Sequence, residues 1–590
     1  MQVQSARSVA RGALASILGL SVFGGVSFAQ LTVDVNTTDD TNDVAPGDGV
    51  CADSNGNCSL RAAVQEANAG GAIGTIRLQP GALYALSLVG AGEDFAGSGD
   101  LDIRTSLTIE GRGARIDGLG ADRIFDVAYR NSFVLRDATL VNGAVVGESG
   151  GALRNGGAAR LFGCMLEASS ATGAGASGGG VINDRGYLLL ADCHVSGCSA
   201  DRAGGAIEAS GGDTHVEGGA LVDNVAGTLP GNGGALHLTG VGTVSLRSVV
   251  VRGNSAGREG GGLWNSSGGV MSVVLCDLSD NEALGTAADD GGGALFNDGG
   301  LMEVRLCELR NNSASQGSGS GGGVLNLGGD VFVSLSRLEG NSARRAGGGV
   351  EASAGLTELF ATELIGNSTG AAPGNGGGLH LTGAGIVRLM QCAVRDNVAS
   401  AEGGGIWNSA TGVMEAAGCT FADNTASGAD ADQGGGGAFN DGGTMSLDQC
   451  LFRGNMADGA SGSGGGVLNL GGDLTVRATR LVDNMCRRAG GGIEAREGTT
   501  TILQVAFVNN STGPAPGNGG GLHLTGAATA TVDLSVVTGN QAANEGGGLW
   551  NSTTGTLIVT TTTIQGNAAP TGADVFNDGG TFTIDGNPVP

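Results

Sequence analysis

The chain of 590 residues contains no lysine, so all 30 of its basic side chains are arginines. Against them stand 57 acidic side chains, and the formal net charge at pH 7 is −27. A body this acidic repels phosphate backbones, so we expect no nucleic-acid binding. Aromatic residues make up only 4% of the chain, whereas 118 residues are glycine. This composition lacks the bulk of an ordinary globular enzyme core and suits a coil with many tight turns.

Long apolar runs are also missing. The best one, residues 13–23, is too short and too rich in glycine to span a membrane. It follows Arg7 and Arg11 and precedes the small-x-small sequence Ser27-Phe28-Ala29, which together predict a secretory signal peptide over residues 1–29. We therefore expect a secreted or cell-surface protein, with a mature chain that starts near Gln30 and has no membrane span.

Near-identical sequence recurs at intervals of 143 residues, as at Gly233, Gly376 and Gly519. Each 143-residue block contains five shorter units of 26 to 32 residues, built on the pattern Gly-Gly-(Gly/Ala)-apolar-x-Asn. A unit this short cannot bury its own apolar face, so neighbouring units must stack. Sixteen such units occur between residues 150 and 583.

A second pattern in each unit, apolar-or-Cys, x, apolar, x, x, Asn, alternates with the period of a short β-strand. Parallel stacking would place its Asn residues above one another as a ladder of amide hydrogen bonds. The sequence therefore predicts an all-β protein, a parallel β-helix with one unit per coil and about 16 regular coils. The predicted ladder comprises Asn224, Asn254, Asn281, Asn312, Asn341, Asn367, Asn397, Asn424, Asn455, Asn484, Asn510, Asn540 and Asn567.

Residues 30–149 differ from the repeats. Cys51 and Cys58 flank a short polar loop, and in an exported protein they predict a disulfide. Ser59 is a suitable cap for a short amphipathic helix that ends near Gly70. We expect this helix to cover the exposed N-terminal end of the solenoid, followed by irregular first coils.

The segment CSLRAAVQEAN, from Cys58 to Asn68, resembles the CSLREA signature of bacterial extracellular repeat proteins, with Ala62 in place of its Glu. The repeat words are also similar to those of the adhesin-like polymorphic outer-membrane proteins. This resemblance implies a secreted or surface right-handed β-helix and no single known activity. The expected organisation is a signal peptide at 1–29, a cap with the first coils at 30–149, three super-repeats at 150–583 and a tail at 584–590.

Seven cysteines occupy the position five residues before the ladder position, which is Asn in five of these units, Ser169 after Cys164 and Cys198 after Cys193. We interpret them as small side chains stacked inside the helix, with disulfides between neighbouring coils as the less favoured alternative. Cys486 is the thiol that we expect to be most exposed. The seven are Cys164, Cys193, Cys276, Cys307, Cys392, Cys419 and Cys450.

The x position of the first pattern holds Glu, His and Trp on three consecutive coils of each copy. If the preceding apolar residue points inward, x points outward, which predicts an exposed strip with ~5 Å steps. Exposed Trp suits sugar stacking, so the strip is a candidate for multivalent binding of surface glycans or extracellular proteins. The alternative is an outer face that accepts varied residues, copied by duplication. The strip comprises Glu208, His237, Trp264, Glu351, His380, Trp407, Glu494, His523 and Trp550.

Asp396 and Asp423 stack on adjacent coils and form the best carboxylate pair for a polysaccharide lyase or glycoside hydrolase. However, all thirteen residues that precede a ladder Asn are Asp, Asn or Gly, which favours a left-handed turn position. No metal-ligand spacing occurs, so we expect no cofactor other than Ca²⁺, which an acidic chain can accommodate.

Two function classes remain. Threefold near-identity favours a non-enzymatic, structural or adhesin-like protein, because an active site is normally one irregular place on a regular scaffold. A cluster of residues found once and lining a cleft would favour the alternative, a carbohydrate-active enzyme.

The end of the solenoid generates the first testable prediction. Only thirteen residues follow Asn577, so the last coil presents an open strand edge. We expect the mature protein to self-associate end to end, measured as a mass above the monomer by light scattering. A monodisperse monomer at high concentration would contradict this expectation.

Overall fold

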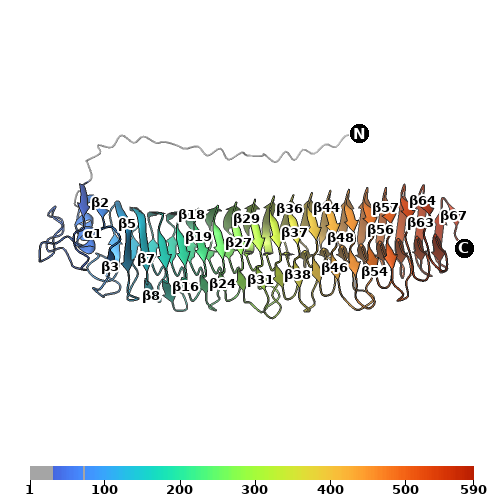
Figure 1. Cartoon of the computed structure of the whole chain (residues 1–590), viewed down its shortest axis with the longest axis horizontal. Helices are drawn as coiled ribbons and strands as arrows, with labels where there is room; N and C mark the ends of the chain where they lie inside the picture. The colour runs from blue at the N-terminus through green and yellow to red at the C-terminus, as the bar shows by residue number, and fades with distance from the viewer. Residues whose placement is uncertain (1–30, 71–72) are drawn as a thin grey trace, which may run out of the picture.

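The computed structural model describes residues 31–70 and 73–590, and it is a long rod (Figure 1). The rod is a parallel β-solenoid of about 18 turns with one helix, which confirms the predicted fold class. The predicted signal peptide at 1–29 and Gln30 lie outside the described residues. Within the described ranges, no helix is long and apolar enough to cross a membrane.

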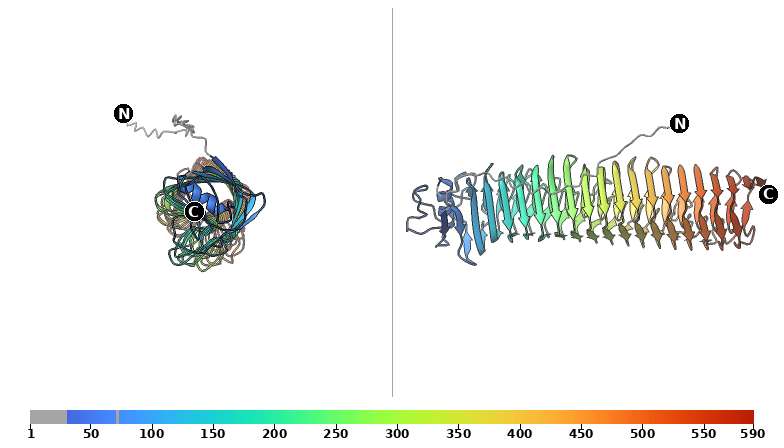
Figure 2. Two further views of the ribbon diagram at one scale, coloured as in Figure 1. Left: turned by 90° about the vertical axis from the view of Figure 1, so that its left-hand side faces the viewer. Right: turned by 90° about the horizontal axis from the view of Figure 1, so that it is seen from above.

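Each regular turn contributes four short strands. One such turn contains β25 (Leu263–Asn265), β26 (Gly269–Val274), β27 (Asp277–Ser279) and β28 (Glu282–Ala283). The first three belong to one continuous 53-stranded sheet and the fourth to a separate 14-stranded sheet. Strands of the regular turns pair in parallel with their counterparts one coil on, so β25 pairs with β29 (Leu295–Arg305). Viewed end-on, the coils enclose a narrow core (Figure 2).

The glycine runs are explained by close approach between coils. A Cβ atom on Gly261 would lie 2.4 Å from the carbonyl oxygen of Gly293 on the next coil. It would also lie 2.5 Å from the backbone of Glu282. Gly260 adopts φ of +63°, a region that favours glycine. The repeated Gly-Gly word is therefore the corner at which one coil passes tightly over its neighbour.

The predicted Asn ladder is present over its whole length. Each ladder amide donates from Nδ2 to Oδ1 of the next ladder Asn at 2.9 or 3.0 Å. Asn397 Nδ2 also donates to the backbone oxygen of Leu364 at 2.9 Å, and its own oxygen accepts from Asn367. The row ends where Asn567 donates to a carboxylate oxygen of Asp574 at 2.9 Å.

A second, interrupted amide row was not predicted. It is formed by the Asn of the Gly-rich word, where Asn265 Nδ2 donates to Asn297 Oδ1 at 2.8 Å. Asn297 in turn donates to Asn326 at 3.0 Å, and Asn326 donates to the hydroxyl of Thr357 at 2.9 Å. Both rows pair buried amide donors with acceptors on the next coil. Among the described residues, the first amide oxygen of the second row, Asn265 Oδ1, accepts no hydrogen bond.

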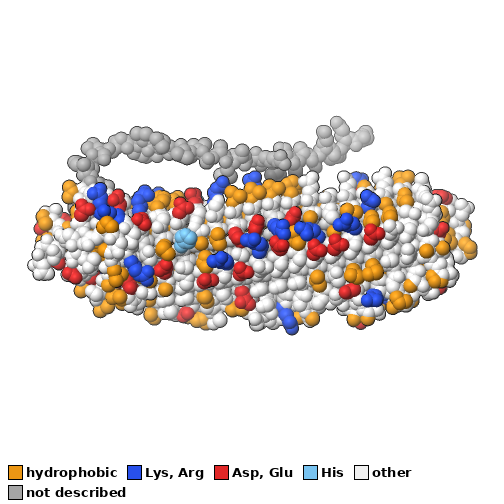
Figure 3. Space-filling view, in the orientation of Figure 1, with side chains coloured by type: hydrophobic (Ala, Val, Ile, Leu, Met, Phe, Trp, Pro, Cys, Tyr) orange, Lys and Arg blue, Asp and Glu red, His pale blue; other side chains and the backbone are white. Residues whose placement is uncertain are grey.

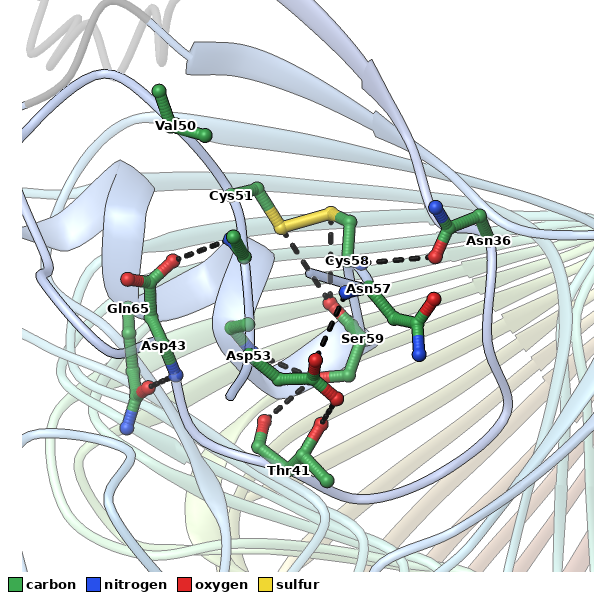
Figure 4. Close-up of a disulfide and its surroundings, with 12 residues drawn as sticks. Asn36, Thr41, Asp43, Val50, Cys51, Asp53, Asn57, Cys58, Ser59 and Gln65 are labelled. Atoms are coloured by element: carbon green, nitrogen blue, oxygen red, sulfur yellow. Dashed lines mark hydrogen bonds between the residues drawn. A yellow bond between two sulfur atoms is a disulfide. The ribbon is translucent and has the colours of Figure 1, made fainter. Parts of the chain in front are cut away.

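The N-terminal end carries the helix and the disulfide. Helix α1 (Leu60–Asn68) lies at this end of the rod (Figures 1 and 2), and the Ser59 hydroxyl accepts from the backbone N–H of Ala62. Cys51 and Cys58 are joined by the predicted disulfide (Figure 4). Arg61, almost fully buried, donates to Asp40 at 2.6 Å. The cap therefore consists of a loop closed by a disulfide and helix α1, which the Arg61–Asp40 ion pair joins to the preceding segment.

The other nine cysteines are free and buried. Neighbours in the stack touch, as where the backbone N–H of Cys392 lies 3.4 Å from Cys419 Sγ. The favoured interpretation of stacked small side chains agrees with this arrangement. The expectation that Cys486 is the most exposed thiol was wrong. Its side chain is only 1% exposed, and its Sγ lies 3.1 Å from the backbone oxygen of Ala489.

The last residues are more ordered than a tail. Ile584 belongs to β66 (Thr581–Ile584), and β67 (Asn587–Pro588) pairs with it in antiparallel register. Val589 packs against the end of the core. The segment expected as a tail, residues 584–590, thus contains the end of β66 and all of β67. In the described chain, β64 (Thr563–Gln565) and β65 (Val575–Asn577) keep unpaired outer edges, so end-to-end association stays a prediction.

The ladder generates the second testable prediction. Asn397→Ala removes the acceptor of two Asn367 N–H groups and the donor to Leu364, all buried. We expect it to lower the free energy of unfolding by about 2–4 kcal/mol, measured from the chemical-denaturation midpoint.

The matched control for this prediction is the neighbouring Asp396→Gly. Asp396 is exposed at φ +58°, a conformation that glycine adopts without strain, so the change should stay within about 1 kcal/mol. Equal midpoints for the Asn397→Ala variant and the unmodified protein would show that the ladder contributes nothing to stability.

Candidate functional site

The predicted Glu-His-Trp strip is buried, so the expectation of an exposed binding strip was wrong. In the first copy the side chains of Glu208, His237 and Trp264 are 2%, 4% and 8% exposed. They do point away from the main core, which takes Ile207, Leu236 and Leu263 from the same strands. The second and third copies repeat this burial at Glu351, His380, Trp407, Glu494, His523 and Trp550.

The loops that precede these strands cover the strip. Glu259, five residues before Trp264, accepts a hydrogen bond from the indole Nε1 at 3.0 Å. Trp264 is stacked between His237, at 4.3 Å between ring centroids, and Phe296, at 6.0 Å. Leu325 extends the same cluster on the next coil. The strip is therefore a second interior layer between the sheet and its loops.

The three copies of this layer are not identical. His237 Nδ1 lies 2.9 Å from Glu208, and His380 Nδ1 lies 2.9 Å from Glu351. In the third copy Arg488 lies 2.6 Å from Glu494, whereas His523 is 3.8 Å away. Burial lowers the pKa of His523 to about 4. In each copy the Trp ring is stacked between a His ring and a Phe ring, which leaves no ring face for a sugar.

The candidate carboxylates Asp396 and Asp423 are exposed and occupy the left-handed turn, with φ of +58° and +56°. Every residue that precedes a ladder Asn has positive φ, which supports the turn interpretation. The other eleven are Asp223, Gly253, Asp280, Asn311, Gly340, Gly366, Gly454, Asp483, Asn509, Gly539 and Gly566.

A groove that the sequence analysis missed lies on the N-terminal coils. The x position that holds Glu, His and Trp in the repeats continues toward the N-terminus as a column of register partners, and this column forms the floor of the groove. The strands concerned are β4 (Leu101–Ile103), β6 (Phe125–Val127), β9 (Leu153–Asn155) and β13 (Val181–Asp184). Here the x residues are Asp102, Asp126, Arg154 and Ile182, and Arg154 is exposed. The cavity measures about 700 Å³ and adjoins a second of about 400 Å³. Tyr129, Gly156 and Arg185 line both.

Ion pairs organise the floor of this groove. Arg154 lies between two carboxylates, 3.1 Å from Asp126 and 3.4 Å from Asp184. Asp126 also lies 3.4 Å from the buried Arg123. Asp102, on the neighbouring coil, accepts from the backbone N–H of Ala96 at 2.7 Å. Burial raises the pKa of Asp102 to about 6, although this hydrogen bond opposes the shift.

Aromatic rings and further arginines form the rim. Tyr129 is 73% exposed, and the Arg130 guanidinium lies 5.0 Å from its ring centroid. Tyr187 lies beneath the guanidinium of Arg160, at 4.9 Å. Two of the three tyrosines of the chain thus line one groove. The available signal was the run of charged x residues Asp102, Asp126 and Arg154, of which only Arg154 lies within the repeated pattern.

Over residues 31–70 and 73–590, no group of three or more His, Cys, Asp or Glu side chains is arranged to hold a metal ion. Comparisons with protein-family models, curated proteins and solved structures found no match for this chain. Any function must therefore be argued from the site itself.

The buried carboxyl of Asp102 generates the third testable prediction. Its pKa is raised from 3.8 to about 6, so the folded state binds more protons than the unfolded state between pH 4 and 6. The stability contributed by the protonated carboxyl is present below pH 4 and is lost as the pH rises to 6. Asp102→Asn should flatten the dependence of the thermal midpoint on pH across this window.

Asp213→Asn is the matched control, because Asp213 lines the same groove but is exposed. It should leave the pH profile unchanged. Identical profiles for the unmodified protein and Asp102→Asn would contradict the raised pKa.

Proposed function

We propose that this chain is a secreted or cell-surface β-solenoid with a non-enzymatic, structural and adhesin-like role, which binds glycans. The signal-like residues 1–29 and the Cys51–Cys58 disulfide support an exported protein. The CSLREA-like segment supports the same location and a right-handed coil. Its partners are surface glycans or other extracellular proteins, and neither nucleic acid nor a membrane span is part of the proposal.

The observation that supports this proposal most strongly is that the Glu, His and Trp side chains of the repeats are buried. The Glu, His and Trp groups of all three copies are interior, and they pack against loops and one another. The outer face over β19 (Ala220–Val222), β27 and β37 (Glu363–Ile365) shows interspersed charges of both signs (Figure 3). Many are mutually paired, as Arg310 with Asp277 at 2.6 Å.

Such repeats supply length and stiffness instead of chemistry. About 18 turns at the strand spacing of ~4.8 Å give a rod of roughly 85 Å. A rod of this kind can hold the groove near its N-terminal end well away from its opposite end. This geometry suits presentation of a binding site at a surface.

A glycoside hydrolase or polysaccharide lyase is the second candidate, and one specific observation favours it. Asp102 and Asp126 are register partners on adjacent strands β4 and β6, and both line the larger cavity of the groove. Two carboxyl groups roughly 5 Å apart suit retaining glycoside hydrolysis, with the protonated one as acid. The raised pKa of Asp102 suits an acid at weakly acidic pH.

The fourth prediction separates these candidates. The mature protein is incubated with acidic and neutral polysaccharides, with and without Ca²⁺, and soluble products are measured. We expect no new reducing ends and no unsaturated uronides. Product release that disappears in both Asp102→Asn and Asp126→Asn, but persists in Asp396→Gly, would establish the enzymatic candidate instead.

A further inference from the structure

We propose that the N-terminal groove, defined by Asp102, Asp126, Tyr129, Arg154 and Arg185, binds an extended anionic polysaccharide. The anionic groups of the sugar chain pair with arginines along the rim, and a sugar ring packs on Tyr129. This inference rests on the proposed glycan-binding function and names the chemical class of the ligand.

The first argument is the local charge. Residues 104–185 contain nine arginines and eight acidic residues, whereas the whole chain has a net charge of −27. This segment thus departs from the acidic average of the chain. The two cavities in it are lined by four arginines and five aspartates: Arg104, Arg130, Arg154, Arg185, Asp94, Asp102, Asp126, Asp184 and Asp213. Because the chain as a whole is acidic, these coils repel a polyanion less than the average surface of the rod does.

The second argument is that three arginines at the groove have no carboxylate partner among the residues described. Arg154 is neutralised between Asp126 and Asp184. In the described chain, Arg104, Arg130 and Arg185 are exposed and lie within ion-pair distance of no carboxylate. Arg104 is held over the ring of Phe95 at 4.5 Å, and Arg130 over Tyr129 at 5.0 Å.

Arg104 uses one guanidinium N–H on the backbone oxygen of Asp94, at 2.6 Å. Its other N–H groups and the guanidinium groups of Arg130 and Arg185 are available for an oxyanion. Carboxylates and sulfates both accept two parallel hydrogen bonds from a guanidinium. Neutral sugars would leave these three charges unmatched, so the rim distinguishes anionic from neutral chains.

The third argument is the shape of the groove. The two adjoining cavities follow the rod axis across the coils of β4, β6, β9 and β13. Four coils at the strand spacing span roughly 15 Å, which exceeds a single anion and suits several residues of a polymer. Tyr129 lies where the two cavities meet, and its exposed ring suits stacking against a sugar face.

The test measures binding of alginate oligomers, dextran sulfate and unmodified dextran to the mature chain, by calorimetry at low and at physiological salt. Dextran and dextran sulfate share a backbone, so their difference isolates the anionic group, and alginate tests carboxylates. We expect binding of at least one anionic polymer, weakened by salt, and none of dextran.

Arg185→Gln should weaken this binding about tenfold, the loss of one charge-assisted hydrogen-bonded contact. Tyr129→Ala should weaken it about fivefold through lost stacking. Arg480→Gln is the matched control, since Arg480 is an exposed arginine on β53 (Arg480–Val482), far along the rod. Circular dichroism checks that each variant retains its strands.

The outcomes discriminate between the two proposals. Binding that is equal for dextran and dextran sulfate, or unchanged in Arg185→Gln, would overturn the anionic groove and leave the adhesin-like role standing. Absence of binding to all three polymers would overturn the inference too. Product release without loss of the anionic preference would overturn the non-enzymatic role alone.

Discussion

The whole molecule depends on strict register between successive coils. Each strand pairs with the same position one coil on, and this repetition puts identical polar groups above one another inside the rod. Buried amides are tolerable there only because each donates to the next, as Asn397 does to Asn424 at 2.9 Å. The glycine corners follow from the same constraint, since a Cβ at Gly261 would clash with the coil above. The strict register therefore accounts for both the stacked Asn residues and the glycine corners.

The column that holds Glu, His and Trp is interior along the three copies and open on the first coils. In the loop before β25, Glu259 accepts a hydrogen bond from Trp264, which is buried. In the first coils Arg154 stays exposed and the column becomes the floor of a groove. The proposed binding site consequently lies where the repeat is least regular.

Much of the fold was predictable, because period and residue type determine it. The ladder from Asn224 to Asn567, the Cys51–Cys58 disulfide and the capping helix after Ser59 all follow from local patterns. The strip at Glu208, His237 and Trp264 was predicted on the correct strands and facing away from the main core. Its burial was not predictable, because alternation within a strand says nothing about the loops that cover it. The groove was missed for a related reason. Tyr129 and Arg185 come together through the stacking of coils that have no repeated sequence pattern in common.

The ladder also has a direction. Each bond between two ladder amides runs from Nδ2 of one Asn to Oδ1 of the Asn on the next coil toward the C-terminus. The row closes on Asp574, whose carboxylate accepts from the last donor, Asn567. An aligned row of amide dipoles carries its positive end there, where an anion stabilises it. A new 143-residue copy inserted inside the array would join two compatible ends, whereas one added beyond Asn567 would have to displace this carboxylate. Insertion of a copy within the array would therefore keep the ladder continuous, whereas addition beyond Asn567 would not.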